Sequence, residues 1–154
     1  MIQRIAILGV GLIGGSLGLA WKKHRADLTL IGYDLPEVLD LALQRGLIDE
    51  RAASPEAAVR EADVVVLAVP LAPMMRLLET IAPHLALGTL VTDVGSVKTP
   101  VMEQARRVLP ATNPFIGGHP MAGSEKSGPA HADAFLFENA TYVLCPPEGI
   151  SSAV

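Results

Sequence analysis

Short apolar runs alternate along the chain with segments whose apolar residues recur every three or four positions. The runs predict strands, because a strand buried on both faces of a parallel sheet is apolar throughout. The recurring spacing predicts helices that cover such a sheet. The expected strands are residues 5–8, 28–33, 63–69, 89–94, 115–117 and 141–145. The expected helices are residues 12–23, 36–46, a segment opening at 54–55, residues 74–82 and a segment around 101–109.

Proline, serine and glycine mark the ends of these helices. Pro36 opens one helix, where its missing N–H is harmless, and Gly46 closes it. Ser54 is an expected N-cap residue, with Pro55 in the first turn. This alternation of strands and helices predicts an α/β fold, a doubly wound and mostly parallel sheet with helices on both faces.

Composition narrows the class of protein further. Of the 154 residues, 50% are hydrophobic and 18% are charged, which excludes a disordered chain. The formal net charge of −4 argues against a nucleic-acid partner bound by bulk electrostatics. Cys145 is the single cysteine, so no intrachain disulfide can form and a cytoplasmic location is the default. The four histidines show no metal-ligand spacing, so no metal site is expected.

The run at residues 5–21 is uncharged and follows Arg4, as the apolar region of a signal peptide follows a basic residue. Its five glycines weaken any continuous apolar helix. It is also shorter than the roughly 20 apolar residues that a spanning helix needs. We therefore expect no targeting segment and no membrane partner.

The junction between the first strand and the first helix carries an informative glycine pattern. Residues 9–14, Gly-Val-Gly-Leu-Ile-Gly, fit G-x-G-x-x-G in the strand-to-helix setting that a dinucleotide site requires. Gly9 permits a tight turn, Gly11 leaves room for a pyrophosphate, and Gly14 lets helix and strand pack closely. The N–H groups of the helix start, at Leu12 and Ile13, are available to phosphates. The pattern predicts a Rossmann-type fold, with a plain glycine-rich turn as the alternative.

Asp34 supports the dinucleotide site and indicates which cofactor it takes. It ends the second strand, about 20 residues after Gly14, where an acid accepts hydrogen bonds from the ribose hydroxyls of NAD. The same charge repels the 2′-phosphate of NADP, and the next two residues supply no arginine. We therefore expect NAD. Val69 and Pro70 end the third apolar strand, at the sheet edge where such folds bind ligands, or they are a plain strand end.

Two later segments point to chemistry beyond packing. Ser96 follows the strand at residues 89–94, so its hydroxyl either faces the cleft or caps the next helix. His119 lies between glycines and a proline in an expected fixed loop, and an imidazole near neutrality suits proton transfer from an alcohol. Its alternative is a structural histidine. Lys98, Ser124 and Glu125 are candidates for the same cleft, or else solvated loop residues.

Three motifs together resemble the prephenate/arogenate dehydrogenase family of tyrosine biosynthesis. They are Gly-Val-Gly-Leu-Ile-Gly-Gly-Ser at 9–16, Asp-Val-Gly-Ser-Val-Lys at 93–98 and Gly-His-Pro-Met-Ala-Gly-Ser-Glu at 118–125. They occur in the family's order with similar separations, and the resemblance extends from residue 1 to about 147. The third motif is far more specific than the glycine pattern.

The resemblance implies a reaction and roles for three residues. In that family, prephenate is oxidised at its ring carbinol, NAD takes the hydride, carbon dioxide leaves, and 4-hydroxyphenylpyruvate forms. His119 matches the histidine that accepts the proton of the ring hydroxyl. Ser96 matches a serine that orients the hydroxyl or the histidine, and Glu125 matches a carboxylate linked to substrate access.

The resemblance also implies a second domain. The family has a helical domain that forms a homodimer and grips a substrate carboxylate. Residues 1–147 would be the dinucleotide-binding domain, and residues 148–154 the start of that helical domain. We therefore expect this chain by itself to bind NAD, to turn over almost no prephenate, and to self-associate through exposed Phe135, Leu136 and Phe137.

Three alternatives stay open. A two-domain dehydrogenase of the β-hydroxyacid type shares the sheet, but it would not explain the setting of His119. Arogenate could replace prephenate as the substrate. A non-catalytic NAD-binding module would bind the cofactor and leave His119 dispensable, and assays of the full-length gene product separate it from the enzymes.

Overall fold

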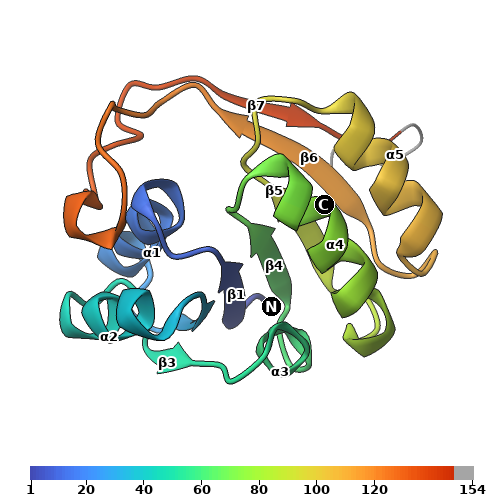
Figure 1. Ribbon diagram of the computed structural model, residues 1–154, viewed down its shortest axis with the longest axis horizontal. Helices are drawn as coiled ribbons and strands as arrows, with labels where there is room; N and C mark the ends of the chain where they lie inside the picture. The colour runs from blue at the N-terminus through green and yellow to red at the C-terminus, as the bar shows by residue number, and fades with distance from the viewer. Residues whose placement is uncertain (148–154) are drawn as a thin grey trace.

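The computed structural model describes residues 1–147 and contains one seven-stranded sheet with helices on both faces (Figure 1). The strands are β1 (Arg4–Leu8), β2 (Thr29–Tyr33), β3 (Glu50–Arg51), β4 (Val64–Leu67), β5 (Leu90–Asp93), β6 (Phe115–Pro120) and β7 (Tyr142–Cys145). The helices are α1 (Leu12–His24), α2 (Pro36–Gln44), α3 (Pro55–Val59), α4 (Leu71–Ile81) and α5 (Thr99–Val108), with short 3-10 turns η1 (Ala82–His84) and η2 (Pro129–His131). Residues 148–154, expected to begin a helical domain, lie outside the described residues.

The order of the strands in the sheet is β3-β2-β1-β4-β5-β6-β7. All neighbouring pairs are parallel except β6 and β7, which are antiparallel. The chain winds outward from β1 through β2 to β3, then returns to β4 on the other side of β1. Such a reversal opens a crevice at the carboxyl ends of β1 and β4, where folds of this kind bind ligands.

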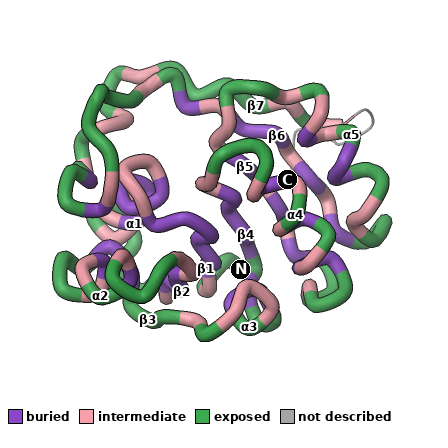
Figure 2. The backbone as a smooth tube through the Cα atoms, in the orientation of Figure 1, coloured by how far each residue is buried: buried purple, intermediate pink, exposed green. Residues whose placement is uncertain are grey.

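The core has two layers, one on each face of the sheet. Because side chains alternate along a strand, Ala6 and Leu8 of β1 enter one layer, and Ile5 and Ile7 enter the other. Helices α3, α4 and α5 cover the first face, whereas α1 and α2 cover the second. Figure 2 shows the result: β4, in the centre of the sheet, is buried along its length, and β1 is buried from Ile5 to Leu8. Burial on both faces explains the continuous apolar runs in the sequence.

Most of the predicted elements are confirmed. Ser54 caps α3 as expected, with its Oγ accepting a bond of 3.2 Å from the N–H of Ala57. No hydrophobic pattern predicts β3, because both of its residues are charged and exposed. Helix α4 begins at Leu71, three positions before the expected start, since its early proline is tolerated in a first turn. Among residues 1–147, no helix reaches the length and hydropathy that a membrane crossing requires.

Two expectations about the carboxyl-terminal part need correction. His119 does not lie in a loop: β6 continues to Pro120, so the histidine is a strand residue that pairs with Val143 of β7. The expected exposed apolar patch is only partly present. Phe135 is 56% exposed, with Lys23 Nζ 3.8 Å from its ring centroid, whereas Phe137 packs against the core layer on the α1 side.

The segment between β6 and β7, residues 121–141, crosses from the α5 side of the molecule to α1 and back (Figure 1). Its far end is fixed to the first helix, because the Asp133 N–H donates to Ser16 Oγ at 2.9 Å. Ala132 is buried there, and its carbonyl accepts a bond of 3.2 Å from Arg45 Nη2. The segment therefore links β6 to the helix that starts at the glycine pattern.

The close packing of α1 gives a test of this arrangement. A Cβ on Gly18 would lie 2.2 Å from the carbonyl oxygen of Leu47, a backbone atom that cannot move aside. We expect Gly18→Ala to lower the free energy of unfolding by about 1–3 kcal/mol through overpacking, despite the better helix propensity of alanine. Urea denaturation measures this change. Gly123→Ala is the matched control, because nothing lies within 4 Å of its Cβ, and equal stability of the two variants would contradict the packing argument.

Candidate active site

The turn after β1 is shaped by backbone atoms in close approach. Gly9 has φ of +102°, and a Cβ there would lie 2.4 Å from the carbonyl oxygen of Ala68 after β4. A Cβ on Gly14 would lie 2.0 Å from the Gly9 oxygen. Gly11 differs, because no atom beyond its chain neighbours lies within 4 Å of the position of its Cβ. Gly9 and Gly14 thus serve the fold itself, whereas the space at Gly11 is open to a ligand.

Helix α1 begins at this open space. Gly11 is its N-cap residue, so the helix starts without a capping side chain, and its first turn contains no acidic residue. The N–H groups of the first turn, at Leu12 and Ile13, lack intrahelical acceptors by the geometry of any α-helix. Together with the positive end of the helix dipole, they form a site suited to a phosphate group.

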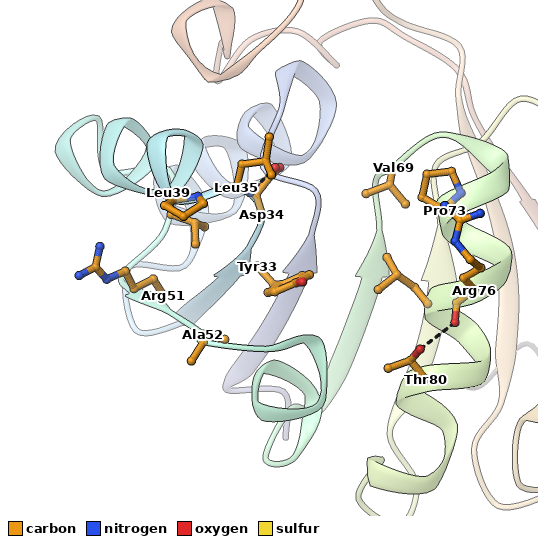
Figure 3. A pocket seen from close by; sticks show the side chains of 13 residues that line it. Tyr33, Asp34, Leu35, Leu39, Arg51, Ala52, Val69, Pro73, Arg76 and Thr80 are labelled. Atoms are coloured by element: carbon orange, nitrogen blue, oxygen red, sulfur yellow. Dashed lines mark hydrogen bonds between the residues drawn. The ribbon is translucent and has the colours of Figure 1, made fainter.

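Asp34 follows β2 and lies beside the glycine turn. Its Oδ2 accepts a bond of 2.7 Å from the N–H of Val10, and its Oδ1 accepts one of 2.7 Å from the N–H of Leu35. The residue lines a cavity of about 730 Å³ between the β2–α2 and β4–α4 connections (Figure 3). Val69 and Pro73 form the opposite wall. The carboxylate is thus fixed at the rim of a space large enough for a nucleoside.

Val69 lines a second cavity as well. A smaller cavity of about 160 Å³ is lined by Val69, Pro70 and Ser96, among others. The structure therefore brings Ser96, from the loop after β5, to the same edge of the sheet as the end of β4. The alternative in which Ser96 caps the next helix is wrong, because the N-cap residue of α5 is Lys98.

A buried ion pair lies between this loop and β6. Asp93, the last residue of β5, is fully buried and forms an ion pair with Lys98. Asp93 Oδ1 accepts a bond of 3.1 Å from the N–H of Gly118, and Lys98 Nζ donates one of 2.6 Å to the Gly118 carbonyl. Lys98 was expected to line the cleft, and the structure engages its ammonium group inside the protein.

His119 follows Gly118 directly and is partly exposed. Ser124 and Glu125 lie on the exposed loop after β6, where Ser124 Oγ accepts a bond of 3.0 Å from the N–H of Lys126. Through the Gly118 contacts, the histidine strand and the Ser96 loop are joined at one end of the sheet. Ser124 and Glu125 lie beyond the end of β6 and are both exposed.

Sequence reasoning missed several residues of this region. Arg51 and Arg76 line the large cavity from β3 and α4, and Arg51 forms an ion pair of 2.8 Å with Asp40. Tyr142 lies beside Gly118, and burial together with the charge of Asp93 raises the pKa of its phenol, which keeps it protonated. Spacing gave no signal for these contacts, because each joins segments that are distant in the sequence. Asp93 and Lys98 were both visible within one motif, but their pairing was not, since Lys98 was expected to face the cleft.

The parallel sheet with its reversal at β1 and β4, the open glycine turn and the acid after β2 define a dinucleotide-binding domain of the Rossmann class. Residues 17–152 match the family model described as prephenate dehydrogenase, nucleotide-binding domain. The chain belongs to this family.

Individual relatives agree with the family match. The chain is 47% identical over 149 residues to the prephenate dehydrogenase of Bacillus subtilis, covering 95% of this chain and 40% of that protein. The crystal structure of prephenate dehydrogenase from A. aeolicus in complex with hydroxyphenyl propionate and NAD+ superposes with a TM-score of 0.88 at 31% identity, over 98% of this chain and 53% of that one. Synechocystis arogenate dehydrogenase gives 0.84 at 37% identity, over 95% and 51%. The chain thus spans about half or less of the length of these relatives.

The open space at Gly11 generates a prediction. Gly11→Val should weaken NAD binding at least about tenfold, because the side chain would fill the space left for the pyrophosphate. The fold should be retained, since no protein atom lies near the new Cβ. Isothermal titration calorimetry measures the affinity, and thermal unfolding checks the fold. Gly123→Ala is the control in an equally open position, and unchanged NAD affinity in Gly11→Val would remove the glycine turn from the binding site.

Proposed function

We propose that this chain is the NAD-binding part of an enzyme that converts prephenate to 4-hydroxyphenylpyruvate by oxidative decarboxylation. One observation supports this proposal most directly: a candidate nucleotide site and a candidate proton-transfer site lie at the same edge of the sheet. The open glycine turn and Asp34 lie on one side of that edge, and the Ser96 loop fixed to the His119 strand lies on the other. The names of the relatives with 47% and 31% identity support the same substrate.

The residues of the first side fit NAD. The space at Gly11 and the N–H groups at Leu12 and Ile13 would receive the pyrophosphate, with Gly9 and Gly14 shaping the turn. Asp34 would accept hydrogen bonds from the ribose hydroxyls, beside a cavity of about 730 Å³ for the adenosine. Val69 and Pro70 would separate this half from the nicotinamide half. When bound, NAD supplies the acceptor for a hydride.

The residues of the second side supply proton transfer and orientation. His119 would accept the proton of the ring hydroxyl as the hydride leaves the same carbon. The bond between the ring and its carboxylate then breaks, and carbon dioxide departs. The electron pair of that bond makes the ring aromatic and places a negative charge on the ring oxygen, which takes the proton back to give the phenol. Ser96 would hold the hydroxyl or the imidazole in line, while Ser124 and Glu125 would lie at the entrance for substrate. Lys98 belongs to this side through its contact with Gly118.

Arogenate is the second candidate substrate. It differs from prephenate in the side chain, which carries an amino group in place of the keto group, and it shares the reacting ring. The similarity to Synechocystis arogenate dehydrogenase at 37% identity favours keeping it. Formation of NADH by the full-length gene product with the two substrates side by side decides between them.

We also infer the setting in which the chain works. Residues 1–147 would be the dinucleotide-binding domain, and a helical domain after it would form the homodimer and grip the substrate carboxylate. The greater length of the relatives supports this arrangement. A cytoplasmic location fits a single cysteine and NAD as the cofactor.

The cofactor preference is tested through Asp34. We expect the chain to bind NAD more tightly than NADP, because the carboxylate repels a 2′-phosphate. Asp34→Asn removes the charge and should narrow the ratio of the two affinities at least about tenfold. Asp27→Asn is the control, since this exposed carboxylate lies at the opposite, amino end of β2. Equal affinity of the unmodified chain for the two cofactors would refute the assignment, since Arg51 or Arg76 would then hold the phosphate.

The role of His119 is tested in the full-length gene product. His119→Asn should lower kcat by about a hundredfold or more, because a general base contributes at least that much. The affinity for NAD should stay within twofold, since the histidine lies outside the nucleotide half. Steady-state kinetics with prephenate and a fluorescence titration with NADH measure the two quantities. A kcat close to that of the unmodified enzyme would make His119 structural and would favour a non-catalytic NAD-binding module.

A further inference from the structure

The backbone pairing between β5 and β6 ends before it reaches the histidine. The last paired residues are Thr92 and Ile116, and the Thr92 hydroxyl donates to the Ile116 carbonyl at 2.7 Å. Beyond this point the two strands are joined by side chains in place of ladder bonds. Gly118 and His119 are therefore not positioned relative to β5 by the sheet itself.

Beyond the last ladder bond, the Asp93–Lys98 ion pair connects β5 to β6, because it bonds both the N–H and the carbonyl of Gly118. The N–H of Gly118 donates to Asp93 Oδ1 at 3.1 Å, and the carbonyl of Gly118 accepts from Lys98 Nζ at 2.6 Å. The remaining oxygen of Asp93 accepts from Lys98 and from the N–H of Gly95 at 2.9 Å. Every bond of the pair thus goes either to its partner, to the Ser96 loop or to the residue before His119.

Burial makes this connection rigid. Asp93 is fully buried, and the side chain of Lys98 is 16% exposed, so the two charges depend on each other and on their hydrogen bonds. The strands also lie very close here, because a Cβ on Gly118 would be 2.4 Å from the backbone oxygen of Asp93. The hydrogen bonds to both polar groups of the Gly118 peptide, together with this close approach, restrict how the peptide can move relative to β5.

On the other side, His119 is paired only with the last strand of the described sheet. Val143 is its register partner on β7, where Val143 and Leu144 are exposed and only the Tyr142 ring packs against Gly118. An exposed edge strand constrains its neighbour less than a buried ion pair does. The position of His119 relative to the end of β5, and hence to Ser96, therefore depends chiefly on Asp93 and Lys98.

We propose that the Asp93–Lys98 pair is a positioning device that holds His119 at its working distance from the reacting hydroxyl. The inference rests on the proposed role of His119 as the base. A displacement of about 1 Å in a reacting group can cost about a hundredfold in rate, so a rigid attachment of the preceding peptide has a direct effect on turnover. Neither residue touches substrate in this assignment, and both act through Gly118.

The competing role for Lys98 is direct binding of a substrate carboxylate. The geometry opposes it, because the ammonium group already bonds to Asp93 and to the Gly118 carbonyl, and the Asp93 charge neutralises it. The two roles differ in their kinetic signature. Loss of a substrate ligand raises KM for prephenate, whereas loss of a positioning group lowers kcat at nearly constant KM.

The test uses Asp93→Asn and Lys98→Met in the full-length gene product. Each variant should lower kcat between tenfold and a hundredfold, with KM for prephenate and the affinity for NAD within about threefold of the unmodified values. The double variant should lose no more than the worse single variant, because the two residues act as one unit. Asp27→Asn, which breaks an exposed pair with Arg25, should leave kcat unchanged. A raised KM at constant kcat in Lys98→Met, or an unchanged kcat in both variants, would overturn the proposal.

Two further measurements keep the test decisive. If a single variant fails to fold, the double variant, which leaves neither charge unpaired, carries the kinetic comparison. NMR of the 154-residue chain reports on the device without any turnover. The Gly118 amide should exchange faster, and the His119 ring resonances should shift, in both single variants and not in Asp27→Asn. Unchanged Gly118 exchange would refute the device, whereas a failure of the unmodified enzyme to oxidise prephenate would refute the proposed function and leave this readout valid.

Discussion

The whole arrangement depends on the close approach of three backbone segments at the centre of the sheet. Gly9 lies against the Ala68 carbonyl, and Gly14 lies against Gly9 itself, with no room for a side chain at either place. This contact brings the start of α1 directly over the ends of β1 and β4. As a result the open N-terminus of the helix points into the crevice that the strand order creates, and an anion can be bound by backbone groups in a protein of net charge −4.

The crevice has two halves, and a different buried or half-buried carboxylate fixes the backbone of each. On the β2 side, Asp34 bonds the glycine turn and faces a large cavity, so one carboxylate both fixes the turn and stays available to a ligand. On the β5 side, both carboxylate oxygens of Asp93 are bonded to groups inside the protein. The segment between β6 and β7 bridges the halves, since it leaves β6 after His119 and is fixed to α1 through Ser16. The glycine turn and the strand that carries His119 thus belong to one connected framework.

Local pattern was sufficient wherever a residue's role follows from its immediate neighbours. Continuous apolar runs identified β1 and β4, Ser54 identified the start of α3, and the glycine spacing identified the turn at Gly9. It was insufficient where pairing decides the structure. The charged strand β3 has no hydrophobic signal and forms only because β2 offers an edge. Strand β6 extends past His119 to Pro120 because β7 returns to pair with it.

The sequence by itself determined the class of sheet, the glycine turn with its acid after β2, and the resemblance carried by three motifs. Those features depend on short-range spacing and on the hydrophobicity of neighbouring residues, so they can be predicted from local sequence. The tertiary structure decided which charges are available. It showed Lys98 turned inward to Asp93, Ser96 placed beside Pro70 and free of a capping role, and Arg76 brought to the rim of the Asp34 cavity. The physical reason differs between these cases. The cavity walls join segments that are distant in the sequence, on which local spacing carries no information. Asp93 and Lys98 are only five residues apart, but the direction of the lysine is set by the Gly118 carbonyl that β6 brings beside it.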